Sequence, residues 1–409
     1  MLTSKKIHIY AAVVLVSTLV SYGWVARSVY DSATRGYADF SVFYAAGKIV
    51  QRGQGHQLYD LELQTRVQKE FSEPAILRNR ALPYMRLPFE ALLFVPFSYL
   101  SYIVAYRIWV GLYVLTVLLA AALLRRKIPE LKLFPAWLYF PAYLGYFPLV
   151  YGMALGQDSG LMLLFFVCFI LALREQKDFR AGCFIGLALI KFQLVLPILF
   201  VLTVKKHFRV LAGFSVVAWT LAGISAWVTG VQGLMGYPTY LWRLNRVPAT
   251  SGIFPNMMPS IRGLVEGWVS PMHSFPALDI LTSALSATLL LWTAMQWRTE
   301  SPRSSKIYTG GVLACVVAAM LSGYHTFAAD LSLLCPVVLL AACAAWRAAD
   351  LDFATRSTLW LGAGGLLFTP FYLLLIWEKQ LNLMVVFPCL LIWGLARATK
   401  TWSSIENPA

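Results

Sequence analysis

Long runs of apolar residues, separated by short polar and basic stretches, make up most of the chain. A helix needs about 20 residues to cross the hydrocarbon core of a bilayer. Runs of about that length predict ten transmembrane helices, at residues 8–27, 101–124, 133–151, 159–173, 208–229, 276–297, 308–322, 326–346, 357–376 and 381–397. Backbone inside lipid must satisfy its own hydrogen bonds, and these runs lack the alternation of barrel strands. We therefore expect an all-helical, polytopic membrane protein.

The basic residues indicate how these helices are oriented. Lys and Arg cluster between the apolar runs, and cytoplasmic loops carry an excess of both residues. Basic clusters flank residues 181–203 at both ends. A single span over this stretch would put the two clusters on opposite sides of the membrane, so all clusters lie on the cytoplasmic side only if the stretch does not cross. We predict a broken helix pair, 181–190 and 193–203, that enters and leaves by the cytoplasmic side, with Lys191 near its tip.

This topology puts both termini in the cytoplasm and two large loops, 28–88 and 230–275, on the outer face. The whole chain, residues 1–409, then forms a single membrane domain. Short outer turns carry Gly156 to Ser159 and the pair Tyr324-His325. The unusual polar residues of the apolar regions therefore converge on the outer side, where we expect a functional site.

The first outer loop has a pattern of its own. Apolar residues recur at helical spacing from Phe40, and Asp60 is a candidate cap for a second helix over 61–71. We expect two amphipathic helices that lie in the membrane interface. A short apolar segment, 88–99, then returns to the membrane.

Composition agrees with this class and excludes others. The chain is 59% hydrophobic and 13% charged, whereas soluble domains average about 45–50% apolar and about 25% charged residues. The net charge of +15 comes from loop clusters that meet anionic headgroups, so it does not indicate nucleic-acid binding. The six cysteines form no CxxC pair and predict neither a disulfide framework nor a zinc site. The chain has no Asn-x-Ser/Thr sequon, which favours a bacterial inner membrane.

Two charged residues in or near apolar sequence are candidates for chemistry. A carboxylate at the mouth of a membrane domain is costly, so Asp39 is either a functional group or the N-cap of the amphipathic helix that follows it. Lys191 is the only Lys or Arg near the middle of a long apolar stretch, where a charge costs about 2.5–3.5 kcal/mol. A bound phosphate would compensate that cost. The alternative is a helix-end lysine that reaches water.

The outer turns supply further candidates, each with a structural alternative. His325 is suited to a phosphate or an acceptor hydroxyl, or it is a structural histidine. Asp330 is expected to pair with His325 or with a basic residue. Gln157 and Asp158 offer hydrogen bonds to hydroxyl groups, and Asp158 is also a good helix cap.

The loop cations and aromatic residues complete the set. Arg262, and less strongly Arg86, are candidates to bind phosphate, or they are solvated loop residues. Tyr44 and Tyr59 are candidates to contact a ligand, although most such aromatics form an interfacial belt. The outer loops have no paired carboxylates at ligand spacing, so we predict no metal site and no cofactor. The pattern still leaves room for a divalent cation held by mixed ligands and water.

Taken in order along the chain, several short motifs resemble glycosyltransferase family 87, which includes polyprenol-phosphate-mannose-dependent alpha-1,2-mannosyltransferases. The motifs are Asp39-Phe40-Ser41, Leu58-Tyr59-Asp60, Leu87-Pro88-Phe89-Glu90, Gly156-Gln157-Asp158-Ser159, Ile190-Lys191-Phe192-Gln193, Met258-Pro259-Ser260 and His325 through Asp330. The chain departs from the family pattern at Leu87 and Phe192, where the family usually has proline. The resemblance implies a GT-C membrane fold, a lipid-phosphate sugar donor, a catalytic Asp in the first outer loop, and inversion at the anomeric carbon.

The sequence thus predicts a glycosyltransferase that moves a sugar, with mannose implied by the resemblance, from a polyprenyl phosphate to a glycolipid or glycan acceptor. An inverting transferase needs a base for the acceptor hydroxyl and stabilisation of the departing phosphate. We expect Asp39 to be the base and Lys191, with Arg262 or His325, to hold the phosphate. The residues expected to contact the sugar or the acceptor are Gln157, Asp158, Tyr44 and Tyr59. No nucleotide-binding motif is present. The alternatives are a flippase of lipid-linked sugars, and a glycan polymerase or ligase with a diphosphate-linked donor.

Overall fold

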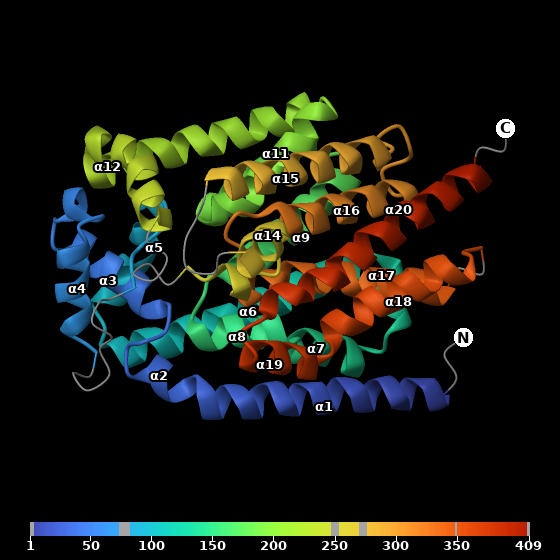
Figure 1. Ribbon diagram of the computed structural model, residues 1–409, viewed down its shortest axis with the longest axis horizontal. Coiled ribbons are helices and arrows are strands. Elements are labelled where there is room, and N and C mark those ends of the chain that lie inside the picture. The colour runs from blue at the N-terminus through green and yellow to red at the C-terminus, as the bar shows by residue number, and fades with distance from the viewer. Residues whose placement is uncertain (1–3, 73–81, 247–252, 270–275, 348–349, 407–409) are drawn as a thin grey trace.

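The computed structural model describes residues 4–72, 82–246, 253–269, 276–347 and 350–406. Over these ranges the chain is helical, without a β-strand. Most helices run along the long axis of an elongated bundle, and the beginning of α1 (Ser4–Ser28) and the end of α20 (Val386–Glu406) lie at the same end (Figure 1). Parts of the predicted outer loops 28–88 and 230–275 lie outside the described residues.

The opposite end of the bundle is covered by short helices of the first loop (Figure 1). These are α2 (Tyr30–Thr34), α3 (Phe40–Gln51), η1 (Gly55–Gln57), α4 (Leu61–Lys69) and α5 (Pro88–Ser98). The predicted cap of α4 is confirmed, because the Asp60 carboxylate accepts hydrogen bonds from the backbone of Glu62 (2.8 Å) and Leu63 (3.0 Å). Leu63 and Val67 are buried on the apolar face of α4, as its spacing predicts.

By length and composition, six helical stretches in the described ranges could cross a membrane, or seven if one bent pair counts as a span. They are α6 (Tyr102–Lys127), the stretch Asp178–Val204, α12 (Phe208–Arg246), α15 (Pro276–Gln296), η6 with α17 (Ala328–Arg347) and η7 with α20 (Leu381–Ile405). One of the six, Asp178–Val204, folds back on itself near Lys191. The bent pair is α18 (Phe353–Leu367) and α19 (Thr369–Trp377), with 62° between them. The multi-span class is confirmed, but the predicted count of about ten full spans is not.

The shortfall has identifiable causes. The apolar helices α9 (Ser159–Arg174) and α16 (Lys306–Ser322) are shorter than a full span. The predicted span 133–151 is wrong, because the chain there breaks into three pieces. These pieces are η3 (Pro129–Leu133), α7 (Ala136–Gly145) and α8 (Phe147–Leu155). Pro135 and Pro148 mark the two breaks. Phe134 is extended because it precedes Pro135, and Pro148 lacks an N–H, so it is tolerated only in the first turn of α8.

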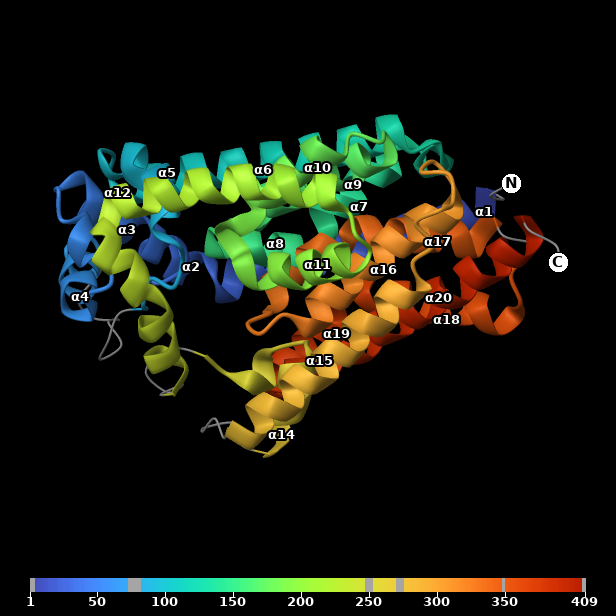
Figure 2. The same cartoon turned by 90° about the horizontal axis from the view of Figure 1, so that it is seen from above.

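The predicted break near Lys191 is present as α10 (Asp178–Leu187), η4 (Ala188–Lys191) and α11 (Phe192–Val204). A side chain on Gly182 would overlap the Val210 carbonyl, and one on Gly186 would overlap Val217. Later residues of α10 therefore contact later residues of α12, so the two helices run parallel and lie side by side (Figure 2). A straight helix over this stretch would be about 40 Å long and would hold α10 away from the start of α12. The chain must therefore turn back at η4.

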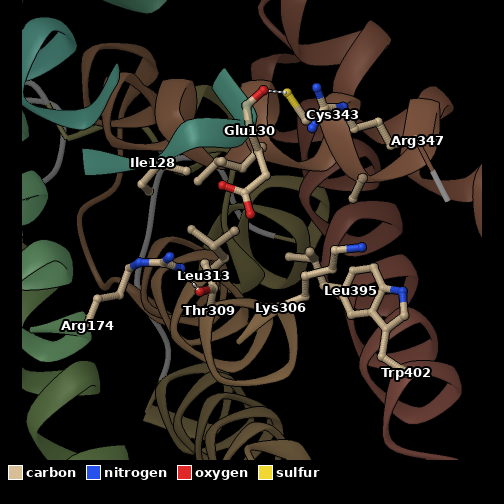
Figure 3. Close-up of a pocket in the computed structure, with 13 residues that line it drawn as sticks. Ile128, Glu130, Arg174, Lys306, Thr309, Leu313, Cys343, Arg347, Leu395 and Trp402 are labelled. Atoms are coloured by element: carbon tan, nitrogen blue, oxygen red, sulfur yellow. Dashed lines mark hydrogen bonds between the residues drawn. The ribbon is translucent and has the colours of Figure 1, made fainter. Parts of the chain in front are cut away.

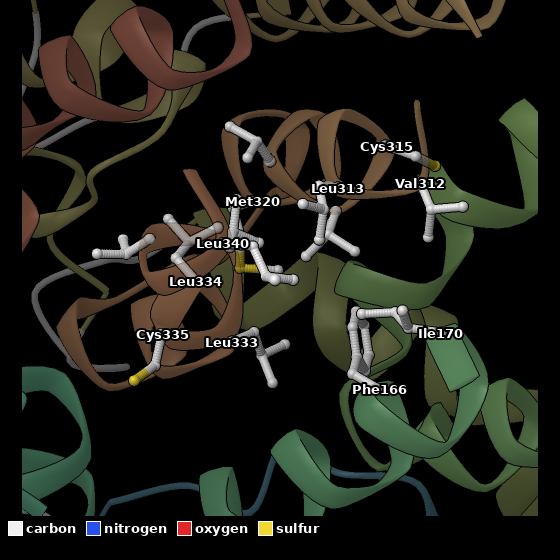
Figure 4. Packing of buried hydrophobic residues seen from close by; sticks show 14 of the residues in the cluster. Phe166, Ile170, Val312, Leu313, Cys315, Met320, Leu333, Leu334, Cys335 and Leu340 are labelled. Atoms are coloured by element: carbon white, nitrogen blue, oxygen red, sulfur yellow. The ribbon is translucent and has the colours of Figure 1, made fainter. Parts of the chain in front are cut away.

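Some helices lie buried at the centre of the bundle, and others lie exposed at its periphery. Within the apolar window of Ala328–Arg347, 94% of the residues are buried, against 17% for α12. The helices α16, α17 (Cys335–Arg347) and α9, with η6 (Ala328–Leu334), contribute aliphatic and aromatic side chains to one buried cluster (Figure 4). The helix α12 kinks at Gly230, where the predicted span 208–229 ends. Two further segments, η5 (Pro255–Met257) and α14 (Ile261–Val269), lie between α12 and α15 in the chain.

Candidate active site

A tight turn between α8 and α9 brings two of the predicted site residues together. Gly156 ends α8 in the left-handed conformation, with φ of 66°, and its carbonyl accepts a hydrogen bond of 2.9 Å from Trp109 Nε1. A side chain on Gly156 would overlap Phe40, so glycine permits both the turn and the close approach of α3. As a result Gln157 lies beside Asp39, and its amide donates to the Asp39 carboxylate.

Asp39 does not act as a helix cap. It occupies the N-cap position of α3, yet its side chain makes no capping hydrogen bond. The residue is partly exposed. Burial raises the pKa of Asp39 above its ordinary value, although the Gln157 hydrogen bond and the charges of Arg86 and Lys191 act in the opposite direction. Of the two interpretations of Asp39, the geometry favours a functional carboxylate.

Lys191 lies at the centre of a buried charge cluster. Its Nζ lies 2.5 Å from Asp330 Oδ1 and 3.0 Å from Asp158 Oδ1, and it donates to Gln157 Oε1 at 3.1 Å. Lys191, Asp158 and Asp330 are each less than 5% exposed. The three ammonium hydrogens therefore already have partners. The alternative that Lys191 reaches water is wrong, and the expected pairing of Asp330 with a basic residue is confirmed.

Arg86 is a residue that sequence reasoning rated too low. It lies in the segment before α5, and its NH2 is 3.1 Å from Asp158 Oδ2 and donates to Gln157 Oε1 at 3.3 Å. Its side chain is 14% exposed, so it reaches the surface of the cluster while Lys191 does not. Asp158 makes no side-chain cap to α9. Burial opposes its ionisation, but the charges of Arg86 and Lys191 outweigh that effect and lower the pKa of the Asp158 carboxyl.

The Gln157 amide links the carboxylate to the cations. Its oxygen accepts from Lys191 and Arg86, and its nitrogen donates to Asp39. This orientation is the one that the neighbours dictate, because an oxygen facing a carboxylate would be repelled. Gln157 is partly exposed. Asp39, Gln157 and Arg86 therefore form the accessible face of a cluster whose other members are buried.

Glu90 belongs to the same cluster and was not predicted. It is 1% exposed, its Oε2 lies 3.8 Å from Arg86 Nε, and neither carboxylate oxygen has a hydrogen-bond partner in the described ranges. The signal that could have revealed it is a lone carboxylate inside the apolar segment 88–99, which is costly without a partner.

Arg262 and His325 form a second cluster. The Arg262 guanidinium is 1% exposed and contacts Glu266 (2.9 Å), Asn245 (2.8 Å) and the Tyr324 carbonyl (3.2 Å). Its NH1 lies 3.3 Å from His325 Nδ1. Burial, with the charges of Arg262 and Arg86, lowers the pKa of His325 to about 3. Because Arg262 can only donate, the neutral imidazole accepts at Nδ1 and carries its proton on Nε2.

The two tyrosines support the fold around the cluster. Tyr44 is 2% exposed and its hydroxyl donates to the Leu100 carbonyl (2.7 Å), so its position does not suit contact with a sugar. The Tyr59 hydroxyl donates to the Arg86 carbonyl (2.8 Å), and its ring packs against Tyr237 and Tyr240. Tyr59 therefore fixes the backbone that carries Arg86. Within the described ranges, no group of three or more His, Cys, Asp or Glu residues could hold a metal ion.

A family model described as glycosyltransferase family 87 matches residues 87–322, more than half of the chain. The matched range contains Glu90, Gln157, Asp158 and Lys191, whereas Asp39 precedes it and Asp330 follows it. The comparisons found no match among curated proteins and none among solved structures.

Proposed function

The chain belongs to glycosyltransferase family 87, and on that premise we propose that it transfers mannose from a polyprenyl phosphate to a hydroxyl group of a glycolipid or glycan acceptor. As a member of this family it is a membrane glycosyltransferase. The observation that carries the proposal is the partly exposed Asp39 carboxylate, which lies beside Gln157 at the accessible face of a cluster that also contains Arg86.

Asp39 acts as the general base. The acceptor oxygen attacks the anomeric carbon while its proton passes to the Asp39 carboxylate, and the bond from that carbon to the phosphate oxygen breaks on the opposite face. The configuration at the anomeric carbon is therefore inverted. A carboxylate whose pKa is raised by burial is a better base near neutral pH than an ordinary one. The polyprenyl phosphate leaves as an anion, so no second carboxylate is needed as an acid.

Arg86 takes the direct role on the leaving phosphate. It is always protonated and its planar fork suits phosphate oxygens. Lys191 has its hydrogens on Asp158, Asp330 and Gln157, so it contributes its positive charge and holds the cluster together rather than binding phosphate directly. His325 offers a neutral Nε2–H donor. Arg262 orients His325, because its own donors are already paired.

Sugar recognition follows from the same contacts. Gln157 is partly exposed, so its amide is suited to a sugar hydroxyl, whereas Asp158 is buried and acts by fixing Arg86 and Lys191. We place the reaction on the outer face of a bacterial inner membrane, with both chain termini in the cytoplasm. The basic loops support this orientation, because they lie at the end of the bundle away from Asp39.

A donor comparison with the purified, lipid-reconstituted protein tests this function. Radiolabelled mannose would be offered as polyprenyl phosphate, polyprenyl diphosphate or nucleotide derivative, with membrane lipid extract as the acceptor. We expect transfer from the polyprenyl phosphate alone, with an inverted anomeric configuration in the product. Preference for the diphosphate would indicate a polymerase or ligase. Movement of the labelled lipid across the bilayer without transfer would indicate a flippase.

A further inference from the structure

A cavity, called here the second cavity to separate it from the Asp39 cluster, lies at the end of the bundle away from Asp39. It has a volume of about 70 Å³ and is lined mainly by apolar side chains of α16, α17 and α20, with Arg174 of α9 and Glu130 of η3 (Figure 3). Asp158 immediately precedes α9, and Arg174 ends that helix. At 1.5 Å per residue, the 16 residues of α9 separate the cavity from the charge cluster by about 24 Å. The cavity is therefore distinct from the candidate active site.

The cavity lies at the depth of lipid headgroups. Arg174 is the last residue of α9, Lys306 is the first of α16 and Arg347 is the last of α17. All three helices are apolar, and cations at the ends of such helices lie at the membrane surface. Lys306 and Arg347 are exposed and form no ion pair in the described ranges. Cations that are free at this depth are suited to a lipid phosphate.

The cavity also contains a carboxylate without a partner. The Glu130 side chain points between Arg174, Thr309 and Lys306 (Figure 3), and its Oε2 is buried without a hydrogen-bond partner in the described ranges. Trp402, which is 6% exposed, has its buried Nε1 similarly unpartnered, and Lys306 Nζ lies 5.8 Å from the centre of its ring. A buried acceptor and a buried donor left unpaired are each costly, so both indicate a polar ligand.

We propose that this cavity binds the headgroup of a phospholipid with a primary ammonium group, as in phosphatidylethanolamine. The ammonium donates to Glu130, the phosphate lies against Lys306, and Arg174 and Arg347 add positive charge. The apolar lining receives the first carbons of the lipid chains.

The charge arrangement favours this headgroup over the other common ones. An anionic headgroup without an ammonium would bring negative charge towards the unpaired Glu130 carboxylate. A choline headgroup carries the positive charge but has no N–H to donate. A primary ammonium gives the carboxylate a charge-assisted hydrogen bond while its phosphate meets the cations.

Native mass spectrometry of the full-length, delipidated protein tests the proposal. Short-chain phosphatidylethanolamine, phosphatidylcholine and phosphatidylglycerol would be titrated separately. We expect phosphatidylethanolamine to bind at least about tenfold more tightly than phosphatidylcholine, since one charge-assisted hydrogen bond distinguishes them. In Glu130→Gln this preference should vanish, whereas in the control Glu300→Gln, an exposed glutamate, it should remain. Lys306→Gln should weaken binding of both lipids.

The unfolding temperature of each variant would show that it is folded. Equal binding of the ethanolamine and choline lipids by the wild type would overturn the proposal, as would tighter binding of phosphatidylglycerol. An ethanolamine preference that survives in Glu130→Gln would place the lipid elsewhere on the protein.

Discussion

The Gln157 amide opposes the effect of burial on the pKa of Asp39, and this gives a prediction about pH. The ionised carboxylate is the base, so transfer should increase as pH rises through the Asp39 pKa, which lies above its ordinary value. The Gln157 hydrogen bond favours the ionised form. Gln157→Leu should therefore move the acid limb of the rate profile to higher pH by about one unit or more. The measurement is initial transfer rate against pH.

The matched control is Gln51→Leu, which replaces an exposed glutamine of α3 and should leave the profile unchanged. An acid limb that stays in place in Gln157→Leu, or moves to lower pH, would show that Gln157 does not stabilise the Asp39 carboxylate.

The buried position of Lys191 predicts a large effect on stability. Lys191→Met leaves the Asp158 and Asp330 carboxylates without their cation, which should cost about 3–5 kcal/mol of unfolding free energy. Lys177 and Glu175 form an ion pair of similar length, 2.6 Å, at the surface. Lys177→Met should therefore cost less than about 1 kcal/mol. Chemical unfolding in mild detergent measures both variants, and similar losses in the two would contradict the assigned burial of the cluster.

Single residues were predictable where their chemistry conflicts with their surroundings. Asp39 and Lys191 could be identified from the sequence because a charge in apolar sequence is costly. Their partners could not, because Lys191 and Asp330 are 139 positions apart and only the fold brings them together. Arg86 was underrated for a related reason. A loop arginine has no unusual sequence context, and Arg86 is placed in the cluster only by its contacts with Asp158 and Gln157.

Among the helices, the broken pair α10 and α11 was predictable and the break of 133–151 was missed. Charge patterning revealed the first, because basic clusters flank 181–203 at both ends. For the second, hydrophobicity alone indicated a span, although Pro135 and Pro148 were present as breaking signals. Hydrophobic runs fix which segments are membrane-embedded, but prolines and packing decide where each helix ends.

The turn at η4 predicts that the two ends of this helix pair lie on the same side of the membrane. Lys177→Cys and Lys206→Cys should therefore react with a membrane-impermeant maleimide under the same condition, namely only after the inner membrane is permeabilised. Labelling in a background without the native cysteines tests this. If one position reacted in sealed spheroplasts and the other did not, Asp178–Val204 would be a single span.

Close packing of α10 against α12 gives a further prediction. Gly182→Ala should destabilise the protein by about 1–3 kcal/mol, because the new methyl group overlaps the Val210 carbonyl. Gly223→Ala in α12 meets nothing within 4 Å and should be neutral or slightly stabilising. Unfolding of the two variants in detergent compares them. Equal tolerance of both would contradict the parallel packing of α10 and α12.

The bundle as a whole separates two chemistries. The Asp39 cluster lies at the end covered by α2 to α5, and the cations of the second cavity lie at the end that contains the beginning of α1 and the end of α20 (Figure 1). The sequence predicted that the basic loops and the Asp39 side of the protein lie at opposite ends of the bundle. It could not predict the cavity, whose lining comes from helix ends far apart in the chain.

Sugar transfer by Asp39→Asn, compared with the wild type, tests the central claim most directly. The protein would be reconstituted in lipid, with radiolabelled polyprenyl-phosphate-mannose as the donor and membrane lipid extract as the acceptor. Asp31→Asn, at an exposed aspartate of α2, is the matched control. We predict that Asp39→Asn loses transfer by about 100-fold or more while it still folds and binds donor, and that Asp31→Asn keeps full activity. Equal transfer by Asp39→Asn and the wild type would remove Asp39 from the chemistry.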